Sequence, residues 1–145
     1  MSPETLFWLA HLPAVVGWVV LLAAPAVGRR AIAIARIAAT VLALGYLIIF
    51  LLEPQGLRTL AGDYSLRGVG SLFADPRLVL LGWVHYLAFD LWVASWEAEE
   101  GRRLGVPHLW LAPCLFLTFM LGPLGLLLFL AVRAVRGRRP AGMAS

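Results

Sequence analysis

The stretch that decides the fold is LVLLGWVHYLAFDLWVASW, residues 78–96. It is close to the roughly 20 residues that a bilayer-spanning helix needs. Further apolar runs of similar length cover residues 6–27, 32–52 and 108–132. The sequence therefore predicts an all-α integral membrane bundle of four transmembrane helices, with residues 1–145 forming a single membrane domain.

The composition also favours a membrane protein. Hydrophobic residues make up 61% of the chain and charged residues 14%, whereas soluble proteins carry about 25% charged residues. The formal net charge is +4, but the arginines other than Arg36 fall in expected loops and in the C-terminal tail, where they fix orientation or contact anionic lipid. We therefore expect membrane lipid, and no nucleic acid, as a partner.

The segments between the apolar runs predict how the spans are connected. Residues 55–77 form the longest polar stretch, and we expect an interfacial loop with a short helix lying on the membrane. Asp75 and Pro76 are typical of a helix cap followed by a first-turn proline, opening the third span. The charged residues 97–103 predict a loop after that span.

An even number of spans places both termini on one side of the membrane. The arginines predicted on that side are Arg58, Arg67, Arg77, Arg133, Arg136, Arg138 and Arg139, against Arg29, Arg30, Arg102 and Arg103 on the other. Because cytoplasmic loops carry an excess of basic residues, we expect both termini to be cytoplasmic.

Asp90 is the main candidate for chemistry. A carboxylate inside a span costs at least ~2.5–3.5 kcal/mol on insertion scales, so Asp90 should face the bundle interior. Depths derived from a rise of about 1.5 Å per residue bring Arg36 and His85 closest to it. An Arg36–Asp90 ion pair is one prediction, and the alternative is that Arg36 reaches out to the head groups. A structural hydrogen bond between helices is the alternative to a catalytic Asp90.

Other polar side chains in the spans extend this candidate site. Tyr86 shares a helix face with Asp90, which follows four residues later. His85 and His11 are able to carry a proton near neutral pH, the alternative being a structural hydrogen bond between helices. Two histidines without a third ligand do not predict a metal site.

The third and fourth spans also carry features suited to a lipophilic ligand. Deep aromatic residues in the third span fit either a flat polyene or helix packing. Gly122-Pro123 should bend the fourth span and free the carbonyl of Phe119, because proline has no N–H. Such a bend is a plausible pocket wall.

The runs GWVHYLAFDL, residues 82–91, and GPLGLL, residues 122–127, resemble the abscisic-acid-deficient-four-like family. Plant members of that family are tied to the synthesis of neoxanthin from violaxanthin in plastid membranes. The resemblance implies a small membrane protein that binds or modifies a carotenoid or a similar isoprenoid. No extension resembling a plastid transit peptide is seen and the composition is rich in arginine and alanine, so we expect a bacterial member in the inner (plasma) membrane.

Two functions follow from this resemblance. The first is a non-redox isomerase that opens a xanthophyll epoxide by acid–base catalysis, with Asp90 as acid, His85 or Tyr86 as base or relay, and no cofactor. The residues expected to contact the substrate are His11, Arg36, Trp83, Phe89, Trp92, Gly122 and Pro123. The alternative is a non-catalytic lipophile-binding protein, acting as a homo-oligomer or as the partner of a carotenoid enzyme. A proton-coupled transporter is a third option, although no internal repeat is visible.

Overall fold

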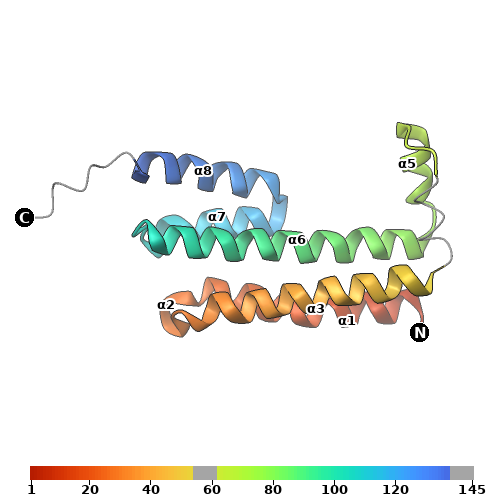
Figure 1. Cartoon of the computed structure of the whole chain (residues 1–145), viewed down its shortest axis with the longest axis horizontal. Coiled ribbons are helices and arrows are strands. Elements are labelled where there is room, and N and C mark those ends of the chain that lie inside the picture. Colours follow the sequence, from red (N-terminus) through yellow and green to blue (C-terminus); the bar gives the residue numbers. More distant parts are fainter. Residues whose placement is uncertain (54–61, 138–145) are drawn as a thin grey trace, which may run out of the picture.

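The computed structural model describes residues 1–53 and 62–137, and its regular elements there are all helices. Three long helices lie side by side, and two shorter ones cover one half of the third (Figure 1). The helices are α1 (Pro3–Leu22), α2 (Ala24–Val27), α3 (Arg30–Leu52), α5 (Leu66–Leu72), α6 (Pro76–Arg103), α7 (His108–Leu121) and α8 (Pro123–Gly137).

Within the described residues, α1, α3 and α6 are the helices long and apolar enough to cross a membrane. The 20 residues of α1 extend roughly 30 Å, which matches the hydrocarbon core of a bilayer. The 28 residues of α6 extend about 42 Å, so its ends reach beyond that core. Predicted spans 32–52 and 78–96 lie inside α3 and α6.

Small side chains allow the three long helices to approach closely. The buried face of α3 is mostly alanine, as is common between membrane helices. Leu21, Ala35 and Leu91, one from each long helix, are all fully buried. The opposite faces carry large exposed apolar side chains, among them Val15, Val19, Ile37, Val41, Leu44 and Ile48. Such surfaces indicate contact with membrane lipid.

The first predicted span, 6–27, is not one helix. α1 begins at Pro3, where the Ser2 hydroxyl accepts a hydrogen bond from the Thr5 N–H, and α1 ends at Leu22. Pro25 follows within the separate short helix α2. The Leu22 carbonyl is freed by this break and accepts a hydrogen bond from His108 Nε2, 2.9 Å away.

The predicted charged loop over residues 97–103 is wrong. These residues form the last turns of α6, and Glu97, Glu99, Glu100 and Arg103 all have polar partners there. Glu100 forms ion pairs with Arg103 (2.7 Å) and Arg133 (2.9 Å). The second of these pairs ties the end of α6 to α8.

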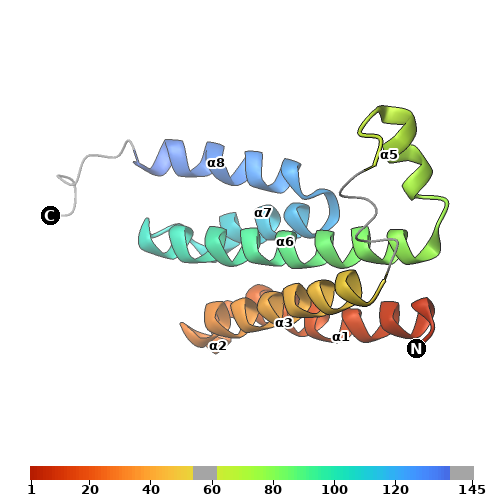
Figure 2. The ribbon, with the colours of Figure 1, turned by 45° about the vertical axis from the view of Figure 1, so that its right-hand side comes forward.

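The predicted fourth span, 108–132, is also wrong as a single helix. α7 ends at Leu121 and the chain reverses at Gly122, whose φ of 43° is in the left-handed region. Pro123 begins α8, which returns alongside α7 (Figure 2). A β-carbon at Gly125 would collide with the Thr118 backbone, so glycine is needed where the two helices cross. The 14 residues of α7 extend only about 21 Å, too short to cross a bilayer.

The α7–α8 hairpin changes the predicted topology. α1 begins at one end of the bundle and α8 finishes at the opposite end (Figure 1). The prediction that both termini share one side depended on four crossings, and it does not hold for Pro3 and Gly137 in this arrangement.

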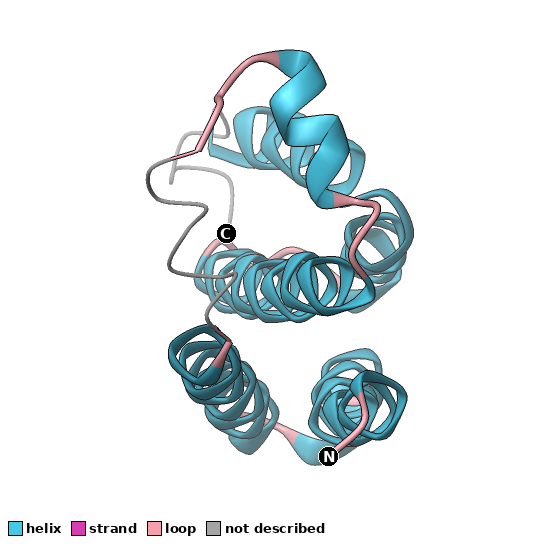
Figure 3. Cartoon of the chain, turned by 90° about the vertical axis from the view of Figure 1, so that its right-hand side faces the viewer, coloured by secondary structure: helices cyan, strands magenta, loops and turns pink. Residues whose placement is uncertain are grey.

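The predicted short helix of the 55–77 stretch is present as α5, while residues 54–61 lie outside the described part of the chain. Ser65 caps α5 by accepting from the Gly68 N–H (3.1 Å). The Ser65 backbone N–H and hydroxyl donate to Asp63, and these bonds lower the pKa of that carboxyl below its ordinary value. α5 runs across the axis of the long helices (Figures 1 and 3), as expected of a helix lying on a membrane surface.

Asp75 and Pro76 start α6 as predicted. The Asp75 carboxylate accepts from the Arg77 N–H at 2.9 Å, and the proline occupies the first turn. The Arg77 side chain then forms an ion pair with Glu53 at 2.7 Å. This pair joins the end of α3 to the beginning of α6.

The hairpin predicts a size limit at Gly125. Gly125→Ala should lower the free energy of unfolding by about 1–3 kcal/mol, the usual cost of overpacking, as measured by thermal unfolding in detergent. Gly45→Ala is the matched control, because a β-carbon there meets nothing within 4 Å. Equal stability of the two variants would contradict the close crossing.

The arrangement also predicts labelling from opposite sides. In inside-out and right-side-out vesicles, Glu4→Cys and Arg136→Cys should react with a membrane-impermeant maleimide from opposite faces. Native Cys114 is buried and should give little background. Reaction of both variants from the same face would restore the four-span topology.

Candidate functional site

Asp90 lies near the middle of α6, where the tip of the α7–α8 hairpin meets that helix. A β-carbon at Gly122 would lie 3.1 Å from Asp90 Oδ1, so the glycine at the tip leaves room for the carboxyl group. Asp90 Oδ2 is buried and has no hydrogen-bond partner in the described part of the chain. An unsatisfied carboxyl oxygen at this depth is costly, which makes it a candidate for ligand binding.

Tyr86 connects Asp90 to the hairpin. Its hydroxyl donates a hydrogen bond to the Phe119 carbonyl at 3.0 Å and also interacts with the Asp90 carboxyl group. Pro123 has no N–H to offer the Phe119 carbonyl in a continuing helix. The free carbonyl predicted from Pro123 is therefore present, and Tyr86 satisfies it.

Glu97, predicted to lie at the membrane edge where the charged loop begins, is instead a buried carboxyl group within α6. Its side chain is fully buried, and both of its oxygens lie 3.0 Å from the Thr118 hydroxyl of α7. The signal available in the sequence was spacing, because Glu97 follows Asp90 by seven residues, or two helical turns. Thr118 is also the one hydroxyl residue in α7.

Trp18 is a second residue near the site that was not predicted from the sequence. Its ring lies 5.1 Å from that of Phe119, and its side chain is almost fully buried. The indole N–H has no hydrogen-bond partner among the described residues. An unused donor on α1 and an unused acceptor on α6 thus both lie beside residues of the hairpin tip.

The predicted Arg36–Asp90 ion pair is wrong. Arg36 instead forms an ion pair with Glu99, with a shortest N–O distance of 2.6 Å. Its guanidinium also lies 5.8 Å from the centre of the Trp92 ring. In the described residues Asp90 has no ion-pair partner, and Arg36 lies further along α6 than its predicted depth.

The structure does not bring His85 to Asp90. His85 stacks on Phe89 at 4.5 Å and meets the edge of Tyr46 at 5.8 Å. It has no hydrogen bond to Asp90 in the described chain. Five residues separate the two, which is about 140° around a helix; their side chains therefore leave α6 in different directions.

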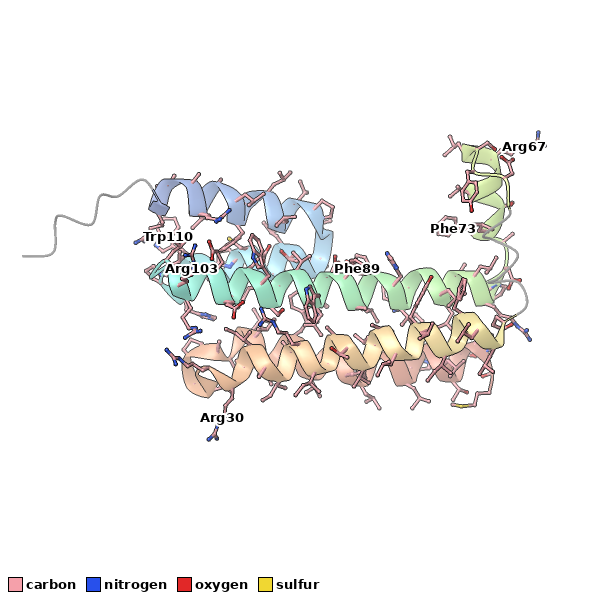
Figure 4. The ribbon with its side chains drawn as sticks, in the orientation of Figure 1. Arg30, Arg67, Phe73, Phe89, Arg103 and Trp110 are labelled. Atoms are coloured by element: carbon pink, nitrogen blue, oxygen red, sulfur yellow. The ribbon has the colours of Figure 1, made fainter. Side chains whose placement is uncertain are left out.

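The predicted substrate contacts divide between two faces of α6. Trp83 lies on the same face as Tyr86 and Asp90, whereas His85 and Trp92 each follow a residue of that face by two positions and are turned about 200° away from it. Phe89 lies between the two faces and stacks on His85. Figure 4 labels Phe89 midway along α6. A single small ligand cannot contact both faces at once.

His11 belongs to the Trp83 side. Its ring stacks on Trp83 at 5.8 Å, and Nδ1 donates to the Phe7 carbonyl at 2.7 Å. Trp83 in turn lies 5.6 Å from the Tyr86 ring. A continuous row of rings therefore leads from α1 to Tyr86, beside Asp90.

The site contains no evident metal ligand set. The described residues hold no group of three or more histidine, cysteine, aspartate or glutamate side chains positioned to bind a metal. What the arrangement offers is a carboxyl group with one free oxygen, a neighbouring phenol and a row of aromatic rings. Such a set suits proton transfer to a flat apolar molecule.

The Glu97–Thr118 contact predicts a specific loss of stability. Thr118→Val leaves the buried carboxyl group without this donor and should reduce the free energy of unfolding by about 1–3 kcal/mol. Thr40→Val is the control, because the Thr40 hydroxyl bonds only the Arg36 carbonyl of its own helix at an exposed position. Equal melting temperatures for the two variants would show that the contact contributes nothing.

Comparison with known proteins gives one match. A family model described as ABA DEFICIENT 4-like matches residues 5–129. No curated protein and no solved structure matches the chain.

Proposed function

The chain belongs to the ABA DEFICIENT 4-like family, and on that premise we propose that it is an isomerase that opens the epoxide of a carotenoid or a similar isoprenoid. Membership is consistent with a carotenoid-related membrane protein. The observation that carries the proposal is the free, buried Oδ2 of Asp90 at the hairpin tip. It provides a proton-transfer group inside an apolar protein.

The reaction needs no oxidant or reductant. A proton is added to the epoxide oxygen, the carbon–oxygen bond breaks, and a proton leaves a neighbouring polyene carbon, so an allenic alcohol isomeric with the substrate is formed. In this scheme Asp90 supplies the first proton, and the carboxylate that remains takes up the second, directly or through Tyr86, so that the acid is restored. Tyr86 is the relay that the geometry favours, because it contacts Asp90 and lies on the same helix face.

The aromatic row supports binding of the substrate. Trp83 is 37% exposed, so part of its face is free to contact a lipophile. The rings of His11 and Phe7 continue this surface along α1. A polyene lying along this row would bring one end group to Asp90.

A second candidate is a lipophile-binding protein without catalysis, paired with a carotenoid enzyme or a second copy of itself. One observation favours it. The Tyr86 hydroxyl proton is engaged by Phe119, and His85 lies on the other face of α6. Of the two bases predicted from the sequence, neither is therefore free beside Asp90 in the described residues.

We also propose an orientation in a bacterial inner membrane. The end of the bundle where α8 finishes carries Arg29, Arg30, Arg102, Arg103, Arg133 and Arg136, and Figure 4 labels two of them there. The other end carries Arg67 and Arg77 among the described residues, together with several acidic groups. The basic-residue rule then places the α8 end in the cytoplasm and the N-terminus outside.

The acid role predicts the effect of one substitution. Asp90→Asn should reduce turnover of a 5,6-epoxy carotenoid such as violaxanthin in proteoliposomes by roughly 10²–10⁴-fold, while binding and stability are retained. His85→Gln, on the opposite face, is the matched control and should remain active. The measurement is the change in pigment composition with time.

Two outcomes would redirect the proposal. Full activity of Asp90→Asn would make Asp90 structural. Bound pigment without turnover in the unmodified protein would favour the binding function instead.

A further inference from the structure

A second pocket lies at the arginine-rich end of the bundle, away from Asp90. It has a volume of about 360 Å³ and is formed by α2, α3, α6 and α7. Ile32, Ala98 and Leu111 are buried and line its interior. The polar lining comes from Arg29, Arg102 and His108. The pocket thus combines an apolar floor with a basic rim.

The two arginines of this rim form no ion pair with a described carboxylate, although Glu99 lies close enough to Arg102 to attract it. No acidic side chain lines the pocket in the described structure. Glu99 is paired with Arg36, and Glu100 is paired with other arginines. Arg29 and Arg102 form no ion pair with any described residue.

The rim is also held in place. His108 Nε2 donates to the Leu22 carbonyl, which fixes the start of α7 against the break after α1. α3 and α7 both begin here without a side-chain cap or an acidic first turn. The partial positive charge of these helix starts adds to that of the two arginines.

The position of the pocket along the membrane-spanning helices indicates which kind of anion it would meet. α1 ends and α3 begins beside it, so it lies where the membrane-spanning helices leave the hydrocarbon core. Phosphate groups of lipids occupy this level, and guanidinium groups bind phosphate oxygens in pairs. An apolar floor below a basic rim suits a molecule with an acyl chain and an anionic head.

We propose that this pocket binds the phosphate head group of an anionic glycerophospholipid. The two arginines that hold the phosphate come from different elements, one from the turn before α3 and one from the end of α6. The bound lipid would join the α2–α3 turn to the α6–α7 turn. This inference does not depend on the chemistry proposed at Asp90.

The test is native mass spectrometry of the purified full chain, titrated with phosphatidylglycerol or with phosphatidylcholine. The unmodified protein should bind phosphatidylglycerol more tightly than phosphatidylcholine. Each arginine near the membrane surface contributes ~1 kcal/mol to the attraction of an anionic lipid. Arg29→Gln combined with Arg102→Gln should therefore weaken the binding of phosphatidylglycerol by roughly 30-fold.

The matched control combines Arg30→Gln with Arg136→Gln. These arginines lie at the same end of the bundle but outside the pocket, and the change in net charge is identical. Thermal unfolding of both double variants checks that they fold. Equal weakening in the two, or equal affinity for the two lipids, would overturn the proposal. Inorganic phosphate that binds alone as tightly as phosphatidylglycerol would overturn the lipid as ligand.

Discussion

A chain reversal inside the bundle is tolerated only when the backbone groups that it exposes are hydrogen-bonded within the protein. Bilayer hydrocarbon offers no water to replace them. At Gly122 the carbonyl accepts from the Gly125 and Leu126 N–H groups, and the Phe119 carbonyl accepts from Tyr86. The candidate site and the hairpin therefore depend on the same residue, since Tyr86 satisfies the Phe119 carbonyl before the turn and also contacts Asp90.

The sequence was sufficient for the family and for the existence of the three long helices, although not for where α1 and α6 end. Apolar length predicted α3 and α6, and Asp75 with Pro76 predicted where α6 begins. Hydropathy failed at residues 108–132 because two short apolar helices that pack together have the same composition as one long helix. The glycines at 122 and 125 carried the missing information, but their meaning depends on a neighbouring helix that sequence alone does not place.

The candidate site was predicted in part, for a geometric reason. Depth along a helix follows directly from sequence, but the direction of a side chain around the bundle does not. Tyr86 and Asp90 share a face and meet in the structure, whereas His85 lies near Asp90 in depth and points elsewhere. Arg36 was misplaced in depth as well, because it pairs with Glu99, more than two helical turns beyond Asp90. Glu97 was missed because a charged run was interpreted as a loop, although its partner Thr118 keeps it inside the bundle.

The half-length hairpin divides the environment of α6 between the two leaflets of the membrane. α7 and α8 lie along α6 only from about Asp90 to Arg103, on the arginine-rich side. The remaining half of α6, which carries Trp83, is left without that cover. A lipophile diffusing in the leaflet on the N-terminal side therefore meets the aromatic row directly, whereas one in the other leaflet meets the hairpin first. The two halves of α6 thus present different surfaces at different depths of the bundle.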